Sequence, residues 1–192
     1  MAFVLDQLKP NQKYFEAICG IPHPSTEEKA VSDYVCSVAE KLGLNYEQDK
    51  FWNVIVRKPA SKGYEDAPVV MLEGHMDMVC VKTPESTHDF SHDPIEIYVD
   101  DKGDIRAKDT TLGADDGYGV AYMLAVMEED FPHPPLELVF TVQEESDTAD
   151  VIKQIAASAA EIIFFIRYPG IKVMRITGGT PFDKGDSPGP PP

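Results

Sequence analysis

His75 and Asp77 follow the apolar run 69–72, whose composition predicts a buried strand. Residues two apart on a strand share a face, so both side chains project together where this strand ends. A metal-bound imidazole has to be neutral and correctly oriented, and a carboxylate on its other ring nitrogen achieves both. The pair has the layout of a metal ligand with an orienting carboxylate, although a strand-end histidine bonded to a neighbour would show the same sequence.

A second acidic motif lies in residues 110–119, where glycines flank Asp115 and Asp116. Apolar residues at helical spacing follow this segment, so Asp115 is predicted to lie at a helix start. Aspartate is favoured at a helix N-cap and glycine in turns, which is the structural alternative for this motif. Capping accounts for one aspartate but not for the whole loop.

A third motif consists of Glu144 and Glu145, directly after the predicted strand 136–142. Adjacent carboxylates raise one another's pKa unless a cation lies between them or they point apart. One glutamate can then be a metal ligand and the other a general base. A solvated loop in an acidic protein is the alternative.

The elements that must position these motifs alternate between helix and strand. Pro10 can open a helix that ends at Gly20, and the capping-box sequence 25–28 precedes a second helix that Gly43 ends. Further strands are predicted at 44–48 and 53–58, with a hairpin formed by 95–99 and 104–107. The pattern predicts an α/β fold, a three-layer sandwich with a mixed sheet. In such folds, ligands gather at the carboxyl ends of strands.

Several segments, in matching order, resemble aminoacyl-histidine dipeptidase, also called Xaa-His dipeptidase or peptidase D. This family is part of the two-zinc aminopeptidase and carboxypeptidase superfamily. The resemblance runs in register from about residue 8 to 145. The segments that carry it are 74–80, 86–90, 93–95, 110–119, 133–137 and 144–145.

The resemblance implies a site with two divalent metal ions, for which zinc is expected in preference to manganese or cobalt. It implies that His75 binds one zinc, that Asp115 bridges both, and that Glu145 binds the other. It also implies that Asp77 orients His75 and that Glu144 is the general base. The implied reaction is hydrolysis of an Xaa-His dipeptide substrate.

The chain departs from the family pattern after Glu145, where a helical-looking run at 151–157 replaces a glycine-containing turn. The family's later aspartate, its lid domain and its C-terminal histidine have no counterpart here. Residues 152–172 resemble a segment that the family places much later, which indicates an internal deletion. The expected organisation is a partial zinc-peptidase catalytic domain at 1–175 and a disordered Pro/Gly-rich tail at 176–192.

Two functional interpretations follow from this departure. Each zinc would have two protein ligands, whereas a catalytic zinc usually has three. The chain is therefore either a metallo-dipeptidase or an inactive fragment that serves at most as a metal-binding or interaction module. The other histidines lie in turns and loops and are expected at the surface or in supporting positions: His23, His88, His92 and His133.

Composition limits the partners. A net charge of −16 argues against nucleic acid and anionic membranes. The three cysteines, Cys19, Cys36 and Cys80, show no CxxC spacing and are predicted to be buried free thiols in a reducing compartment. No signal peptide or bilayer-spanning apolar run is recognised, so a cytoplasmic location is expected. Loss of covering parts is expected to leave strand 136–142 with unpaired edges and to cause self-association.

Overall fold

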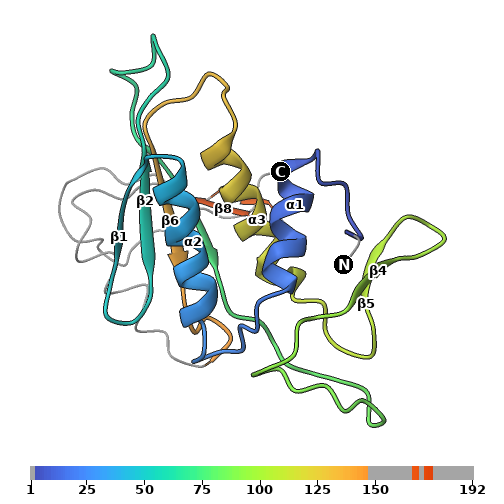
Figure 1. Ribbon diagram of the computed structural model, residues 1–192. Coiled ribbons are helices and arrows are strands. Elements are labelled where there is room, and N and C mark those ends of the chain that lie inside the picture. Colours follow the sequence, from blue (N-terminus) through green and yellow to red (C-terminus); the bar gives the residue numbers. More distant parts are fainter. Residues whose placement is uncertain (1–2, 147–165, 169–170, 175–192) are drawn as a thin grey trace, which may run out of the picture.

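The largest element of the fold is a six-stranded mixed sheet, which lies to one side of the helices (Figure 1). The computed structural model describes residues 3–146, 166–168 and 171–174. The strand order is β1-β2-β6-β3-β8-β7, with β3 and β6 parallel and the other pairs antiparallel. The predicted mixed sheet is confirmed. Its strands are β1 (Asn45–Gln48), β2 (Val54–Lys58), β3 (Val70–His75), β6 (Leu136–Thr141), β7 (Ile166–Tyr168) and β8 (Ile171–Met174).

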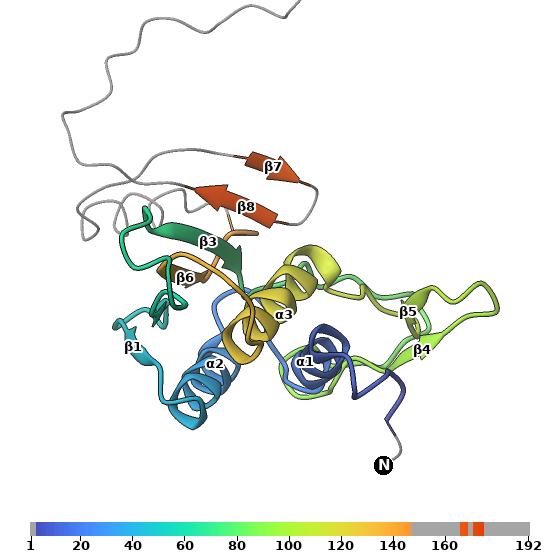
Figure 2. The same ribbon diagram turned by 90° about the horizontal axis from the view of Figure 1, so that it is seen from above.

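The helices α1 (Pro10–Cys19), α2 (Lys29–Lys41) and α3 (Ala114–Glu128) all lie on one face of the sheet (Figure 2). α2 packs on β1 and β2, α3 packs on β3, and α1 packs against α3. Phe15 of α1 meets Tyr118 of α3 edge to face, with ring centroids 4.8 Å apart. The described residues thus build two layers of the predicted sandwich, and a third layer is not among them.

Strand β6 is paired on both sides, by β2 and by β3. The prediction that this strand would have unpaired edges is therefore wrong. β2 supplies an antiparallel neighbour and β3 a parallel one, and both come from the part of the chain that precedes β6. The helical run predicted at 151–157 and the domain boundary predicted at 175 lie outside the described residues.

The predicted capping box before α2 is also wrong. The N-cap of α2 is Glu28, and it makes no side-chain capping hydrogen bond. Ser25 Oγ instead donates to Asp77 Oδ2 at 2.7 Å, and Glu28 Oε1 accepts the Thr26 N–H at 2.9 Å. Ser25 is thus engaged by a residue 52 positions away, and Glu28 accepts from Thr26 instead of from the Ser25 N–H that a capping box requires.

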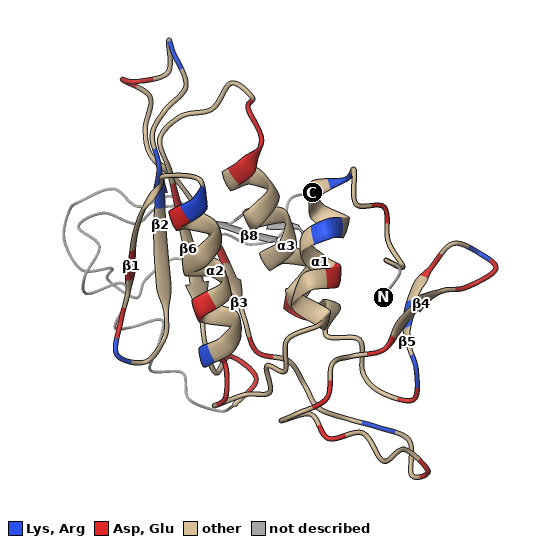
Figure 3. Cartoon of the chain, viewed as in Figure 1, with Lys and Arg blue, Asp and Glu red and all other residues tan. Residues whose placement is uncertain are grey.

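The hairpin is confirmed as β4 (Ile97–Val99) and β5 (Ile105–Ala107), a separate two-stranded sheet. Asp100 stabilises its turn by accepting the backbone N–H groups of Lys102 and Asp104 at 2.9 and 3.0 Å. Figure 3 shows acidic residues spread over the helices, strands and loops of the described part of the chain, so they are not confined to the three acidic motifs. No helix among the described residues is long and apolar enough to cross a membrane.

Candidate metal centre

Parallel pairing of β3 and β6 brings the first and third motifs together. His75, the last residue of β3, is paired in register with Thr141, the last residue of β6. The carboxyl ends of parallel strands meet at the same sheet edge, so the turn that carries Glu144 and Glu145 begins beside His75. This is how residues about 70 positions apart reach one site.

The two nitrogens of the buried His75 imidazole face different partners. Nδ1 lies 3.0 Å from the Asp77 backbone oxygen and 3.4 Å from Asp77 Oδ1. Nε2 lies 3.3 Å from Asp115 Oδ1 and 4.0 Å from Glu144 Oε2. Asp77 therefore occupies the side of the ring expected of an orienting carboxylate, and Nε2 faces the other acidic motifs.

The donor atoms on this side suit a divalent cation. Ligand atoms of His75, Glu144 and Glu145 all lie within 4.8 Å of one another. Nitrogen and oxygen ligands of a tetrahedral zinc, each at about 2.0–2.1 Å, are separated by about 3.3–3.4 Å. The distance between His75 Nε2 and Asp115 Oδ1 is 3.3 Å, and the Asp115 side chain is 86% exposed, so its carboxylate also faces solvent.

The buried Asp77 contacts most of the other residues of the site. Its Oδ2 accepts hydrogen bonds from Ser25 Oγ and from the Glu145 N–H at 3.1 Å, and its Oδ1 accepts the Glu144 N–H at 3.0 Å. Burial alone would raise the pKa of Asp77, but the hydrogen bonds from His75, Ser25 and the two backbone amides lower that pKa to about 2. Asp77 is therefore ionised at neutral pH.

The surrounding charge also affects His75 and Glu145. Burial lowers the pKa of His75, but Asp77, Asp116 and Glu144 outweigh burial and raise this pKa to about 9. Burial raises the pKa of Glu145, and the neighbouring carboxylates of Glu144 and Asp115 add to that rise. This excess of negative charge is relieved by a proton or by a cation.

At the start of α3, two adjacent aspartates have different environments. Gly113 is the N-cap, with a left-handed φ of 69°, and no side chain caps the helix. Asp115 and Asp116 have non-helical φ/ψ values, and the peptide bond between them is cis. The prediction that Asp115 lies at a helix start is confirmed, and its side chain is directed to His75 rather than to a cap. Asp116 is the buried member of the pair.

Gly74 makes room for Asp116. A Cβ atom at residue 74 would lie 2.5 Å from Asp116 Oδ2 and 3.2 Å from Met123 Sδ. Real Cβ atoms essentially never approach other atoms to 2.5 Å. With the Asp116 side chain in this position, the close packing between β3 and α3 leaves no room for a Cβ atom at residue 74.

Three polar residues that support the site were not recognised from the sequence. Asn53 Oδ1 accepts the Val142 N–H at 3.1 Å, and Glu28 Oε1 accepts the Gln143 N–H at 3.0 Å. Ser25 reaches Asp77, as described above. Their partners lie 52 to 115 positions away, so no local sequence pattern could have identified them.

The remaining histidines and cysteines differ in part from expectation. His23 and His133 are buried, which excludes the surface position for them and leaves the other expected placement, a supporting position inside the protein. Nδ1 of His23 lies 2.5 Å from the Ile21 backbone oxygen, and Nδ1 of His133 lies 2.8 Å from the Pro134 oxygen, so one ring nitrogen of each has a hydrogen-bond partner inside the protein. Cys19 and Cys36 are buried as predicted, but Cys80 is exposed because it follows β3 into a surface loop.

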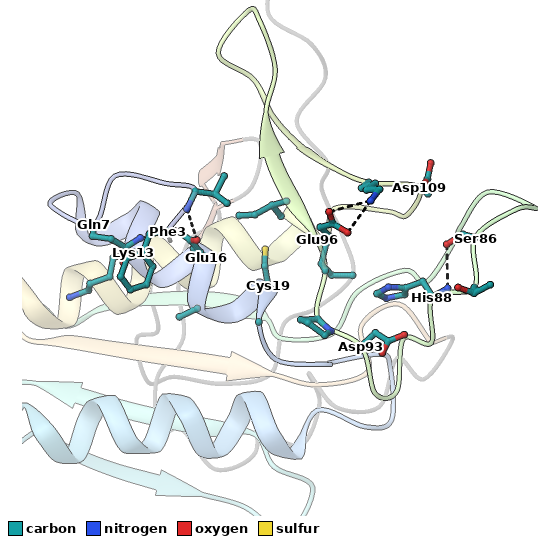
Figure 4. A pocket seen from close by; sticks show the side chains of 18 of the residues that line it. Phe3, Gln7, Lys13, Glu16, Cys19, Ser86, His88, Asp93, Glu96 and Asp109 are labelled. Carbon is teal, nitrogen blue, oxygen red and sulfur yellow. Dashed lines mark hydrogen bonds and ion pairs between the residues drawn. The ribbon is translucent and has the colours of Figure 1, made fainter. Parts of the chain in front are cut away.

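A cavity of about 1040 Å³ lies away from this cluster, between the N-terminal segment, α1 and the hairpin (Figure 4). Its polar lining is mostly bonded within the chain. Glu16 accepts the Val4 N–H, Glu96 pairs with Lys108, and Ser86 accepts the His88 N–H. None of the predicted site residues lines it.

Comparison with known proteins finds relatives among peptidases. Over 145 residues the chain is 42% identical to a protein of Escherichia coli (strain K12) described as cytosol non-specific dipeptidase, covering 74% of this chain and 30% of that protein. A solved structure of aminoacylhistidine dipeptidase from Vibrio alginolyticus matches with a TM-score of 0.71 and 38% identity, over 79% of this chain and 30% of the other. No family model matches.

More distant structures share the fold. A tripeptidase from Staphylococcus aureus matches with a TM-score of 0.59 and 24% identity, over 75% of this chain and 38% of the other. These findings confirm the resemblance to aminoacyl-histidine dipeptidase and the α/β fold. The chain spans about 30% of the length of the first relatives that it matches.

Proposed function

We propose that this chain carries part of a metallo-dipeptidase site, which holds two divalent cations, preferentially zinc, and hydrolyses Xaa-His dipeptides. The observation that supports it most directly is the approach of the Asp115 and Glu144 carboxylates to the Nε2 side of His75. The relatives are described as dipeptidases, and one as an aminoacylhistidine dipeptidase. A cytoplasmic location is part of this proposal, because the Escherichia coli relative is a cytosol dipeptidase.

In this proposal His75 binds one cation, Asp115 bridges both, and Glu145 binds the second. Asp77 holds the imidazole through Nδ1, so that Nε2 points to the cation. The buried and ionised state of Asp77 supports this role, because it presents a permanent acceptor to Nδ1.

Glu144 would serve as the general base. Its carboxylate would accept a proton from the attacking water as the water oxygen bonds to the peptide carbonyl carbon. The C–N bond would then break, and the same group would return the proton to the leaving amine. Bound divalent cations would polarise the peptide carbonyl and lower the pKa of the attacking water. The partial exposure of Glu144 beside His75 leaves its carboxylate open to a substrate.

A second candidate is a metal-binding remnant without turnover. It is favoured by the coverage of about 30% of the relatives and by the ligand count. The described residues supply two protein ligands for each cation, whereas a catalytic zinc usually has three. In this case the fold would bind a cation without completing the reaction.

Hydrolysis by the purified chain separates these candidates. Aminoacyl-histidine and β-alanyl-histidine dipeptides are incubated with the chain and added zinc or manganese, beside an alanyl-alanine control that lacks histidine. Glu144→Gln should abolish turnover, whereas Glu65→Gln, in an exposed loop, should leave turnover unchanged. Turnover that survives in Glu144→Gln refutes the assigned base. Metal binding by calorimetry without turnover supports the remnant, and absence of both refutes the metal site.

A further inference from the structure

We propose that Glu28 is a positioning residue that sets the turn carrying Glu144 and Glu145. This inference rests on the proposed function, because the placement of these two carboxylates matters for a cation site. Glu28 is 0% exposed and lies directly before α2. The sequence pattern assigned it to a capping box, and that assignment does not hold.

Glu28 connects two distant segments through one oxygen. Its Oε1 accepts the Thr26 N–H at 2.9 Å and the Gln143 N–H at 3.0 Å. Its Oε2 is buried and has no hydrogen-bond partner among the described residues. The acceptor function therefore resides in Oε1, and a glutamine can supply the same carbonyl oxygen.

The backbone N–H groups of residues 142–145, which form this turn, all donate to side chains of other segments. Val142 N–H is accepted by Asn53, Gln143 N–H by Glu28, and the N–H groups of Glu144 and Glu145 by Asp77. All three acceptors are buried. Four consecutive backbone donors thus depend on side chains from other segments rather than on a regular element.

The backbone of Gln143, whose N–H Glu28 accepts, has an unusual conformation. Its φ of 60° is in the left-handed region, which is uncommon for a residue other than glycine. The next two residues carry the carboxylates of the cluster with His75. Loss of the Glu28 acceptor would leave the Gln143 N–H without this bond and allow the turn to relax away from His75.

The test compares four variants of the full chain by calorimetric titration with zinc and with manganese. Glu28→Leu removes the acceptor at similar size, and Glu28→Asp shortens its reach. Both should weaken metal affinity about 10–100-fold, as is typical when groups that orient ligands are lost. Glu28→Gln should restore the affinity of the unmodified chain. Val35→Ala, a cavity substitution in the buried face of α2, should lower Tm without changing the affinity.

Amide hydrogen exchange at residues 143–145 provides a readout without metal. Exchange should accelerate in Glu28→Leu and Glu28→Asp and stay slow in Glu28→Gln. If Glu28→Leu does not fold, Glu28→Asp decides the outcome. Native affinity and slow exchange in Glu28→Asp, or weak binding by Glu28→Gln, would overturn the inference. If the unmodified chain binds no cation, the proposed function fails, and the exchange rates still decide the role of Glu28.

Discussion

At the scale of single residues, the site depends on the different environments of chemically similar carboxylates. Asp77 is buried and receives hydrogen bonds from Ser25 and two backbone amides, which fixes it as an anion. Asp115 is largely exposed and meets His75 only through Nε2. Glu145 has a raised pKa because burial and neighbouring negative charge act together. One carboxylate can therefore orient the imidazole while the others remain available to a cation.

Replacing the buried carboxylate tests that distinction. Asp77→Asn keeps the shape of the side chain but removes one acceptor oxygen and the negative charge. We expect metal affinity to fall about 10–100-fold, because the imidazole loses its orienting partner and the turn loses one anchor. Calorimetric zinc titration measures the change, with Asp66→Asn in an exposed loop as the control. Equal affinities of Asp77→Asn and the unmodified chain would contradict the prediction.

A glycine on β3 provides a second test at this scale. Gly74→Ala places a Cβ atom 2.5 Å from Asp116 Oδ2, so the variant should be destabilised by about 1–3 kcal/mol. Gly117→Ala is the matched control, because its Cβ would meet only ordinary contacts of 3.6 Å and longer, and it lies within α3. Urea denaturation measures both. A Gly74→Ala chain as stable as the unmodified one would show that the Asp116 side chain can move aside.

At the scale of elements, parallel pairing between β3 and β6 accounts for the convergence of the motifs. The register that pairs His75 with Thr141 places the turn after β6 beside the histidine. α3 packs on β3 and brings Asp115 to the same edge. α1 supports α3 from the side away from the sheet, through Phe15 and Tyr118.

The contact between α1 and α3 is expected to matter for stability more than for metal affinity. Phe15 is 1% exposed, so Phe15→Ala should lower the free energy of unfolding by about 3–5 kcal/mol. Phe51→Ala, at an exposed position, should have a small effect by comparison. Thermal and urea denaturation give the stabilities, and zinc titration of the folded fraction gives the affinity. A small loss of stability in Phe15→Ala would show that α1 is not integral to the core.

At the scale of the whole molecule, the chain corresponds to about 30% of its relatives and leaves apolar side chains exposed. Leu8 is 93% exposed and Phe3 is 72% exposed, both in the N-terminal segment. Contact with another chain would remove these side chains from water. The predicted self-association therefore remains an expectation, although β6 is not the edge that causes it.

Light scattering after gel filtration tests this expectation. The average mass should exceed the 21.3 kDa of one chain and rise with concentration. A double variant, Phe3→Ser with Leu8→Ser, should shift the average mass toward that of the monomer. The control is Lys62→Ser, in an exposed loop. A concentration-independent monomer would contradict the prediction.

The sequence by itself determined the order and type of the main elements, the acidic motifs, and the resemblance to a dipeptidase. Local patterns carry this information, since the apolar run before His75 and the helical spacing after Asp115 depend on near neighbours. Tertiary structure alone decided that Ser25 and Glu28 serve the site instead of a helix cap, that Asn53 anchors the turn after β6, and that His23 and His133 are buried. The physical reason is that hydrogen bonds between segments 52 to 115 residues apart compete with local ones, and only the assembled sheet determines which are formed.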